Sequence, residues 1–232
     1  MNDAAGAPLG LLGGSFDPVH AGHLQLAADA QAALGLAQLR FVPAGQPWQK
    51  GSITPATERL RMLTLALQGR ANWQLDTCEI ERVGPSYTID TLQQFRDEYG
   101  PRRPLVWILG FDQLRQLATW HRWQELINLA HLAYAQRAGS ANVLDDKMSR
   151  YVEQYRATAE QLQRRACGSV VEFAMQPVDC SATQIRHWLA ASEKEQAARF
   201  LPEAVFAYIE EHHLYQPSHG KQKTPTPGSR RP

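Results

Sequence analysis

Cysteine is scarce in this sequence, and its three copies stand far apart. Cys78, Cys167 and Cys180 include no C-x-x-C pair. Zinc clusters and the disulfide frameworks of small secreted domains both need closely spaced cysteines. The sequence therefore predicts neither, and it favours a reduced environment and a cytoplasmic location.

Long hydrophobic runs are absent as well. No apolar run approaches the ~18 residues that a membrane-spanning helix needs. The first five residues, MNDAA, carry no basic group, unlike the start of a secretory signal. Hydrophobic residues are 44% and charged residues 20% of the 232, a balance that favours an ordinary globular fold over a membrane protein.

A strong net charge is also missing, although the charge is unevenly placed. The formal net charge is +1, but residues 217–232 hold four basic residues and no acidic one. The rest of the chain has 20 basic against 23 acidic residues, a net charge of −3. This balance argues against nucleic-acid or membrane partners. We expect a domain over residues 1–216, a disordered basic tail over 217–232, and a monomer or weak homo-oligomer.

What the sequence does have is a dense motif near its beginning. Residues 13–23 read GGSFDPVHAGH, between the apolar run 9–12 and apolar residues at helical spacing from 24 onward. Asp17 followed by Pro18 predicts the helix start, with Asp17 as the N-cap. A strand, a glycine turn and a helix N-terminus would direct backbone N–H groups at one point, which suits a phosphate.

Two histidines follow within this motif. His20 and His23 are three residues apart, so they share one face of the predicted helix. Gly22 between them removes side-chain bulk where a ligand could lie. Imidazole N–H groups beside a helix N-terminus can donate to phosphate oxygens, which makes this pair a candidate for phosphate chemistry.

The rest of the chain alternates strand and helix patterns. Strands are predicted at 39–42, 73–78, 104–110, 131–135 and 170–173, and helices from 54, from about 86 and over 145–166, 181–186 and 202–212. The alternation predicts an α/β fold with a Rossmann-like, doubly wound parallel sheet. The charged residues at 58–61 are expected to be solvated. Ser86 or Thr88 is expected either to cap its helix alone or to cap it and also contact a ligand.

A second motif, DCSATQIR, occupies residues 179–186. Ser181 and Gln184 have the spacing of a capping box, so another helix begins here. Ser181 and Thr183 offer hydroxyl groups, and Arg186 offers a planar, permanently charged fork. Alone, these would be a cap and a surface salt-bridge former. Together with the first motif they favour a polyphosphate between two helix N-termini.

The first motif resembles the signature of nucleotidyltransferases that carry H-x-G-H. The second resembles their I-S-[AS]-T-x-[IL]-R motif, with Cys180 in the usual isoleucine position. Over roughly residues 9–215 the chain is similar to the bacterial nicotinate mononucleotide adenylyltransferases. The resemblance implies that ATP and nicotinate mononucleotide react to give deamido-NAD and pyrophosphate, a step of NAD biosynthesis.

The resemblance also implies a set of site residues. Implied catalytic residues are His20, His23 and Arg186. Implied ATP-binding residues are Gly13, Gly14, Ser15, Phe16, Gly110, Asp112, Ser181 and Thr183. Implied nicotinate mononucleotide-binding residues are Lys50, Ser86, Tyr87, Thr88, Trp120 and His121. No protein metal ligand is expected, because Mg²⁺ would arrive with ATP, held mainly by phosphate oxygens and water.

Several local readings stay open. Lys50 is either a phosphate contact or a solvated lysine, and residues 47–50 read PWQK where relatives commonly have PPHR or PPHK. Asp112 either accepts from ribose hydroxyls or caps a helix. The acceptor could also be nicotinamide mononucleotide or phosphopantetheine, or the protein could be a non-catalytic nucleotide sensor. A zinc or serine hydrolase does not fit the spacing of His20 and His23 or the context of Ser15.

We expect the His20→Ala variant to fold but to lose nearly all turnover, because it lacks the imidazole assigned to the α-phosphate. Pyrophosphate release from ATP and nicotinate mononucleotide measures turnover, and circular dichroism checks the fold. A folded variant with near-normal turnover would remove His20 from the mechanism.

Overall fold

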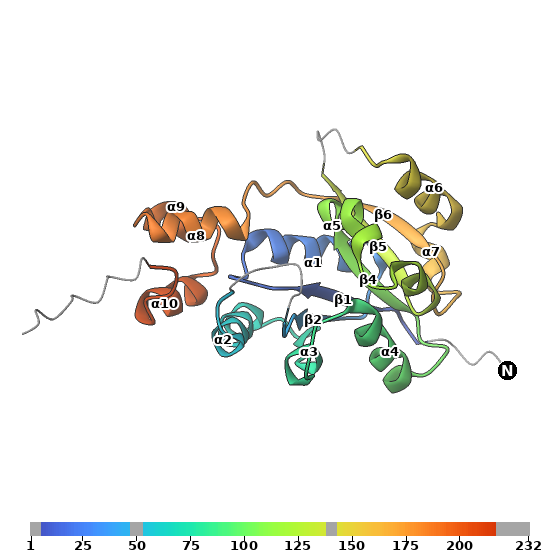
Figure 1. Ribbon diagram of the computed structural model, residues 1–232, viewed down its shortest axis with the longest axis horizontal. Coiled ribbons are helices and arrows are strands. Elements are labelled where there is room, and N and C mark those ends of the chain that lie inside the picture. Colours follow the sequence, from blue (N-terminus) through green and yellow to red (C-terminus); the bar gives the residue numbers. More distant parts are fainter. Residues whose placement is uncertain (1–5, 47–52, 138–142, 217–232) are drawn as a thin grey trace, which may run out of the picture.

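Six parallel strands form the centre of the protein, with helices on both faces (Figure 1). The computed structural model describes residues 6–46, 53–137 and 143–216. The strands are β1 (Leu9–Gly14), β2 (Gln38–Pro43), β3 (Trp73–Leu75), β4 (Leu105–Gly110), β5 (His131–Arg137) and β6 (Val170–Met175). Their order is β3-β2-β1-β4-β5-β6, which confirms the predicted doubly wound sheet.

The helices follow the strands in the expected alternation. The α-helices are α1 (Ala21–Leu34), α2 (Ala56–Leu67), α3 (Cys78–Glu81), α4 (Thr88–Tyr99), α5 (Phe111–Gln116), α6 (Asp146–Tyr155), α7 (Ala159–Leu162), α8 (Ala182–Ala190), α9 (Lys194–Ala198) and α10 (Glu203–Glu211). Two 3₁₀ helices, η1 (Leu117–Thr119) and η2 (Trp123–Asn128), precede β5. No helix among the described residues has the length and apolar character needed to cross a bilayer.

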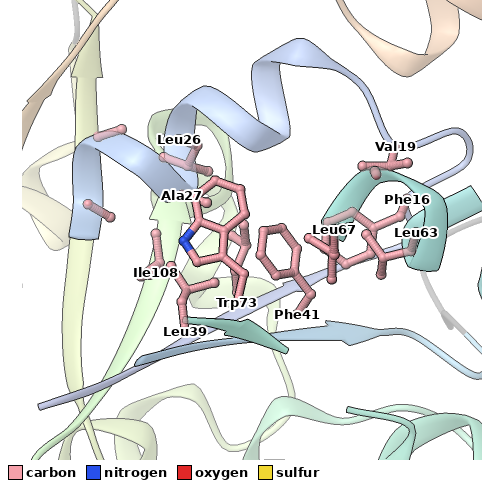
Figure 2. Close-up of a cluster of buried hydrophobic side chains, with 14 of the residues drawn as sticks. Phe16, Val19, Leu26, Ala27, Leu39, Phe41, Leu63, Leu67, Trp73 and Ile108 are labelled. Atoms are coloured by element: carbon pink, nitrogen blue, oxygen red, sulfur yellow. The ribbon is translucent and has the colours of Figure 1, made fainter. Parts of the chain in front are cut away.

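Alternate residues of the strands face opposite sides of the sheet and fill two separate cores. On one side, Leu12 and Phe41 pack with residues of α1, α2, α8 and α10. Figure 2 shows the Phe41 ring lying between the rings of Trp73 and Phe16, with centroid distances of 5.3 and 5.8 Å. On the other side, Leu11 packs with residues of α4, α5, α6 and η2. Helices on both faces explain why the strands are apolar throughout.

The sheet reverses its winding between β1 and β4, and this position locates the site. β1 pairs with β2 on one side and β4 on the other, with Leu12 opposite both Phe41 and Ile108. The carboxyl ends of β1 and β4, at Gly14 and Gly110, therefore lie along the same edge. In open α/β sheets, ligands bind where the winding reverses at this edge.

The predicted start of α1 is wrong by three residues. His20, not Asp17, is the N-cap, and the first helical residue is Ala21. Asp17 is instead buried, 4% exposed, in the loop before the helix. Gly35 ends the helix in the left-handed conformation, as a C-cap glycine does.

Other boundaries also differ from the sequence patterns. β3 covers only Trp73–Leu75, and the expected strand residue Cys78 begins α3. The helix expected over 145–166 is two helices, α6 and α7. Tyr87, rather than Ser86 or Thr88, is the N-cap of α4, and it makes no side-chain capping bond. The tail predicted over 217–232 lies outside the described residues.

We expect Gly13→Ala to lower the free energy of unfolding by about 1–3 kcal/mol, the usual cost of overpacking a core. A Cβ at Gly13 would lie 2.4 Å from the Trp107 ring, and Trp107 is 3% exposed. Gly110→Ala is the matched control, because its added Cβ would have no neighbour nearer than 3.8 Å. Urea unfolding of both variants tests this, and equal midpoints would contradict it.

Candidate active site

The loop between β1 and α1, residues 15–20, is the centre of the site. Gly13 and Gly14 end β1, and Phe16 follows with φ of +48°. The left-handed conformation is uncommon for a bulky residue, and here the Phe16 side chain is completely buried. Its ring packs at 5.0 Å against the ring of His23. The buried ring thus anchors the loop, and the backbone of residues 13–15 stays only half-buried.

The two histidines cap α1 reciprocally. Nδ1 of His20 accepts the backbone N–H of Gly22 at 3.1 Å, and Nδ1 of His23 accepts the N–H of His20 at 3.3 Å. The two ring centroids are 3.9 Å apart. Because both Nδ1 atoms accept, the neutral rings carry their proton on Nε2. The short distance between the rings confirms that the pair lies on one face at the helix N-terminus.

The N-terminus of α8 lies beside that of α1. Ser181 caps α8, accepting the N–H of Gln184 at 3.2 Å as the capping-box spacing predicts. Cys180, one residue earlier, places its sulfur 3.4 Å from Nδ1 of His20. Two motifs separated by about 160 residues are thus brought together.

Arg186 joins α8 to the β1–α1 loop. Its Nη1 donates to the backbone oxygen of Asp17 at 2.7 Å, and its Nη2 donates to Oγ1 of Thr183 at 3.3 Å. The guanidinium is therefore held by two bonds at the junction of the two helix ends. A planar cation beside backbone N–H groups is well suited to phosphate oxygens.

Arg59 supports the same loop from α2, where we expected solvated charge, so that expectation is wrong. It is 1% exposed, and its guanidinium donates to the backbone oxygens of Thr54 at 2.9 Å, Ser15 at 2.9 Å and Gly45 at 3.5 Å. Burial lowers the pKa of Arg59, and the negative charge of nearby Asp17 acts in the opposite direction.

A second loop, residues 44–46, connects this region to the start of α4. The N–H of Ala44 donates to the oxygen of Gly14 at 2.8 Å. Oγ of Ser86 accepts the N–H groups of Gly45 and Gln46 at 2.9 and 3.1 Å. The hydroxyl of Ser86 is therefore engaged within the protein. The loop and the α4 N-terminus are fixed to the end of β1.

A buried carboxyl group lies under this loop. Glu79 is 5% exposed, and its Oε1 accepts from Oγ1 of Thr91 at 2.7 Å. Burial raises the pKa of Glu79, while hydrogen bonds from Thr91 and Ser86 lower it in part. A Cβ at Gly45 would lie 2.1 Å from the backbone oxygen of Glu79, so only glycine fits there. This close contact between Gly45 and Glu79 fixes the position of the 44–46 loop against α3.

Aromatic side chains meet next to α4. The rings of Tyr87 and His121 lie 4.4 Å apart, and Trp120 is half-buried against the same apolar core. Thr88 is the first residue of α4. Tyr87 and His121, which come from separate segments, are thus brought together, and Tyr87 and Trp120 pack against the same core.

The remaining predicted residues are less engaged. Gly110 ends β4, and its N–H donates to Gln113 at 2.9 Å as α5 begins. Asp112 lies in the first turn of α5 with an exposed side chain, 3.9 Å from Arg115. Lys50 lies outside the described residues. Within the described ranges, no three His, Cys, Asp or Glu side chains gather as a metal site.

Comparisons with known proteins place this geometry in a family. The cytidylyltransferase-like family matches residues 11–188. A probable nicotinate-nucleotide adenylyltransferase from Dechloromonas aromatica is 44% identical over 218 residues, covering 91% of this chain and 99% of that protein. The chain belongs to the cytidylyltransferase-like family, among the nicotinate-nucleotide adenylyltransferases. A relative of the same description from Aeromonas salmonicida is 40% identical, covering 90% of this chain and 98% of that protein.

Solved structures share the fold. Plasmodium falciparum nicotinic acid mononucleotide adenylyltransferase complexed with NaAD superimposes with a TM-score of 0.70 at 16% identity, covering 90% of this chain and 97% of that one. The same enzyme complexed with APC gives a TM-score of 0.68 at 15% identity, with the same coverage. At these identities the likeness shows the α/β architecture of the family alone.

Sequence patterns missed Arg59, Asp17 and Tyr215 as supports of the site. For Arg59 a signal was present, because it shares helical spacing with buried Met62, Leu63 and Ala66. A charged residue on an apolar stripe indicates a buried partner. Asp17 and Tyr215 gave no such signal, since their contacts depend on how distant segments meet.

We expect Arg59→Met to lower the free energy of unfolding by about 3–5 kcal/mol, because it removes one member of a buried charged network. Arg61→Met, an exposed position on the same helix, should change it by less than about 0.5 kcal/mol. Urea unfolding followed by circular dichroism measures both. Similar small effects would show that the Arg59 bonds contribute little.

Proposed function

We propose that the protein transfers the adenylyl group of ATP to the phosphate of nicotinate mononucleotide, giving deamido-NAD and pyrophosphate. The observation that carries this proposal is the meeting of the α1 and α8 N-termini at Arg186, beside the imidazole rings of His20 and His23. The relatives' shared description supports the same reaction. The reaction belongs to NAD biosynthesis.

The triphosphate of ATP would lie across the two helix N-termini. His20 would contact the α-phosphate. His23, Ser15, Ser181 and Arg186 would contact the phosphates from α to γ, with Thr183 holding the Arg186 fork. Gly13, Gly14 and Phe16 keep the backbone close to the nucleotide, and Gly110 and Asp112 stand at the β4 end where a ribose would lie.

The chemistry needs positioning and charge stabilisation more than proton removal. An oxygen of the acceptor phosphate, already ionised at neutral pH, attacks the α-phosphorus, and the bond to pyrophosphate breaks. No general base is required for this step. The Nε2–H groups and Arg186 would stabilise negative charge on the α-phosphate and on departing pyrophosphate.

The acceptor would bind on the α4 side. Tyr87, Trp120 and His121 provide aromatic faces against which a pyridine ring can stack. Thr88 stands at the α4 N-terminus, where a carboxylate is favoured. Ser86 supports this segment from within by holding the 44–46 loop. Lys50 remains a predicted contact from the neighbouring loop.

Mg²⁺ would arrive with ATP. Mg²⁺ prefers oxygen ligands and keeps several waters when it bridges phosphates. The described site offers hydroxyl and backbone oxygens, and the buried carboxylate of Asp17 already accepts from Tyr215 and Thr54. The nucleotide would therefore supply the principal ligands, and the ion would neutralise part of the phosphate charge.

We expect pyrophosphate release with Mg-ATP and nicotinate mononucleotide, with kcat/KM about tenfold or more above that for nicotinamide mononucleotide. A charged hydrogen bond to the nicotinate carboxylate is worth about that factor. Phosphopantetheine should give no release. His20→Ala protein serves as the control for contaminating activity.

The other outcomes discriminate between the alternatives. Release with phosphopantetheine alone would keep the transfer chemistry and discard the acceptor assigned to Tyr87 and Trp120. No release with any acceptor, together with ATP binding, would indicate a nucleotide sensor.

A further inference from the structure

The end of the described chain returns to the centre of the site. Oη of Tyr215 donates to Oδ1 of Asp17 at 2.7 Å, across 198 residues of sequence. His213 and Tyr215 both have left-handed backbones, with φ of 51° and 64°. Bulky residues adopt this conformation at a cost, so other contacts must hold the turn after α10 in place.

Asp17 is the point where this turn meets the β1–α1 loop. Its carboxylate is buried, and its second oxygen accepts the N–H of Thr54 at 3.3 Å. A buried carboxylate needs such partners to offset its lost hydration. The positive charge of Arg59 lies close enough to interact with Asp17 and Tyr215. The side chain of Asp17 is thus held by two hydrogen bonds and by the nearby charge of Arg59.

The backbone of Asp17 makes the contact that matters for chemistry. Its carbonyl oxygen accepts from Nη1 of Arg186 at 2.7 Å. Any shift in the Asp17 peptide would therefore move the Arg186 guanidinium. It would also move the neighbouring peptides of Ser15 and Phe16, which carry the loop.

We propose that Tyr215 is a positioning residue for adenylyl transfer. It acts through Asp17 to hold the β1–α1 loop and Arg186 in the positions that the reaction needs. The inference rests on the proposed function, but it concerns a residue outside the family match, which ends at residue 188. Tyr215 touches neither the predicted phosphate donors nor the aromatic group directly in the bonds described. In this proposal, its effect on the loop is transmitted by its hydrogen bond to the buried carboxylate of Asp17.

The chemistry of the hydroxyl suits this task. Burial and the charge of Asp17 raise the pKa of Tyr215, so the hydroxyl stays protonated and donates throughout the neutral range. The oxygen also lies 3.9 Å from the sulfur of Met62 on α2. The C-terminal turn therefore ties α2 and the β1–α1 loop together.

Tyr215→Phe tests the proposal, with Tyr208→Phe as the matched control. Tyr208 lies on α10 and donates to Glu58 of α2 at 2.8 Å, so both changes remove one tyrosine-to-carboxylate bond between the C-terminal region and the body. Only the Tyr215 bond is made to a residue of the β1–α1 loop, Asp17. The readouts are the Kd for an ATP analogue with a methylene group between the α and β phosphorus atoms, and kcat and KM for both substrates.

We expect Tyr215→Phe to weaken analogue binding and to lower kcat, each by about tenfold, the scale of a hydrogen bond to a charged group. KM for nicotinate mononucleotide should stay within about twofold, because the acceptor residues are held by Ser86 and α4. Tyr208→Phe should leave all these constants within about twofold. Equal effects of the two variants, or a change in thermal stability alone, would overturn the proposal.

A double-mutant cycle tests transmission through Asp17. In an Asp17→Ala background, which lacks the acceptor oxygen for the Tyr215 hydroxyl, Tyr215→Phe should weaken analogue binding by less than about twofold. Additive effects of the two changes would overturn action through Asp17.

Failure of the function and failure of this inference are separable. Wild-type protein that binds the analogue but releases no pyrophosphate would refute the proposed transfer, while the binding constants of the variants would still decide the role of Tyr215. Wild-type protein that does not bind the analogue would overturn both.

Discussion

The site depends on a loop whose polar groups are satisfied by distant parts of the chain. In the loop between β1 and α1, Phe16 is in a left-handed conformation with its ring buried. Arg59 holds its first carbonyl group, Arg186 holds that of Asp17, and Tyr215 holds the Asp17 side chain. Buried polar groups without such partners are costly. The loop is therefore held by contacts from α2, α8 and the C-terminal turn together.

Hydrogen bonds within the site also decide which of its groups carry positive charge and which donate as neutral groups. The Nδ1 atoms of His20 and His23 accept backbone N–H groups, so protonation of either ring at Nδ1 would break a cap. The rings are thus suited to donate as neutral groups, and the permanent charge in contact with the loop comes from Arg59 and Arg186. Arg59 donates to backbone oxygens inside the protein, so Arg186 and the two helix N-termini are the groups that our proposal assigns to the polyphosphate. Transition-state charge is well served by such fixed donors, because they need no reorganisation.

Several polar residues have a role in the structure that differs from the role predicted from the sequence, and the physical reason is the same for each. Asp17 has the residue type and position of an N-cap, but His20 takes that role and Asp17 turns inward to Tyr215. Ser86 has the character of a cap or a ligand, yet its hydroxyl supports the 44–46 loop. Local propensity predicts which polar groups need partners, whereas only the packed chain decides which partner each one finds.

The sequence by itself determined three things: the doubly wound parallel sheet, the placement of both motifs between a strand and a helix, and the family. These follow from apolar periodicity and from eleven adjacent residues, GGSFDPVHAGH, whose residue types are typical of a glycine turn that leads into a helix. Tertiary structure alone decided that Cys180 lies against His20, that Arg59 donates to Ser15 and Gly45, and that Tyr215 reaches Asp17. Those contacts join residues far apart in sequence. They exist only because a doubly wound sheet brings the carboxyl ends of its strands, and the helices that follow them, to one edge.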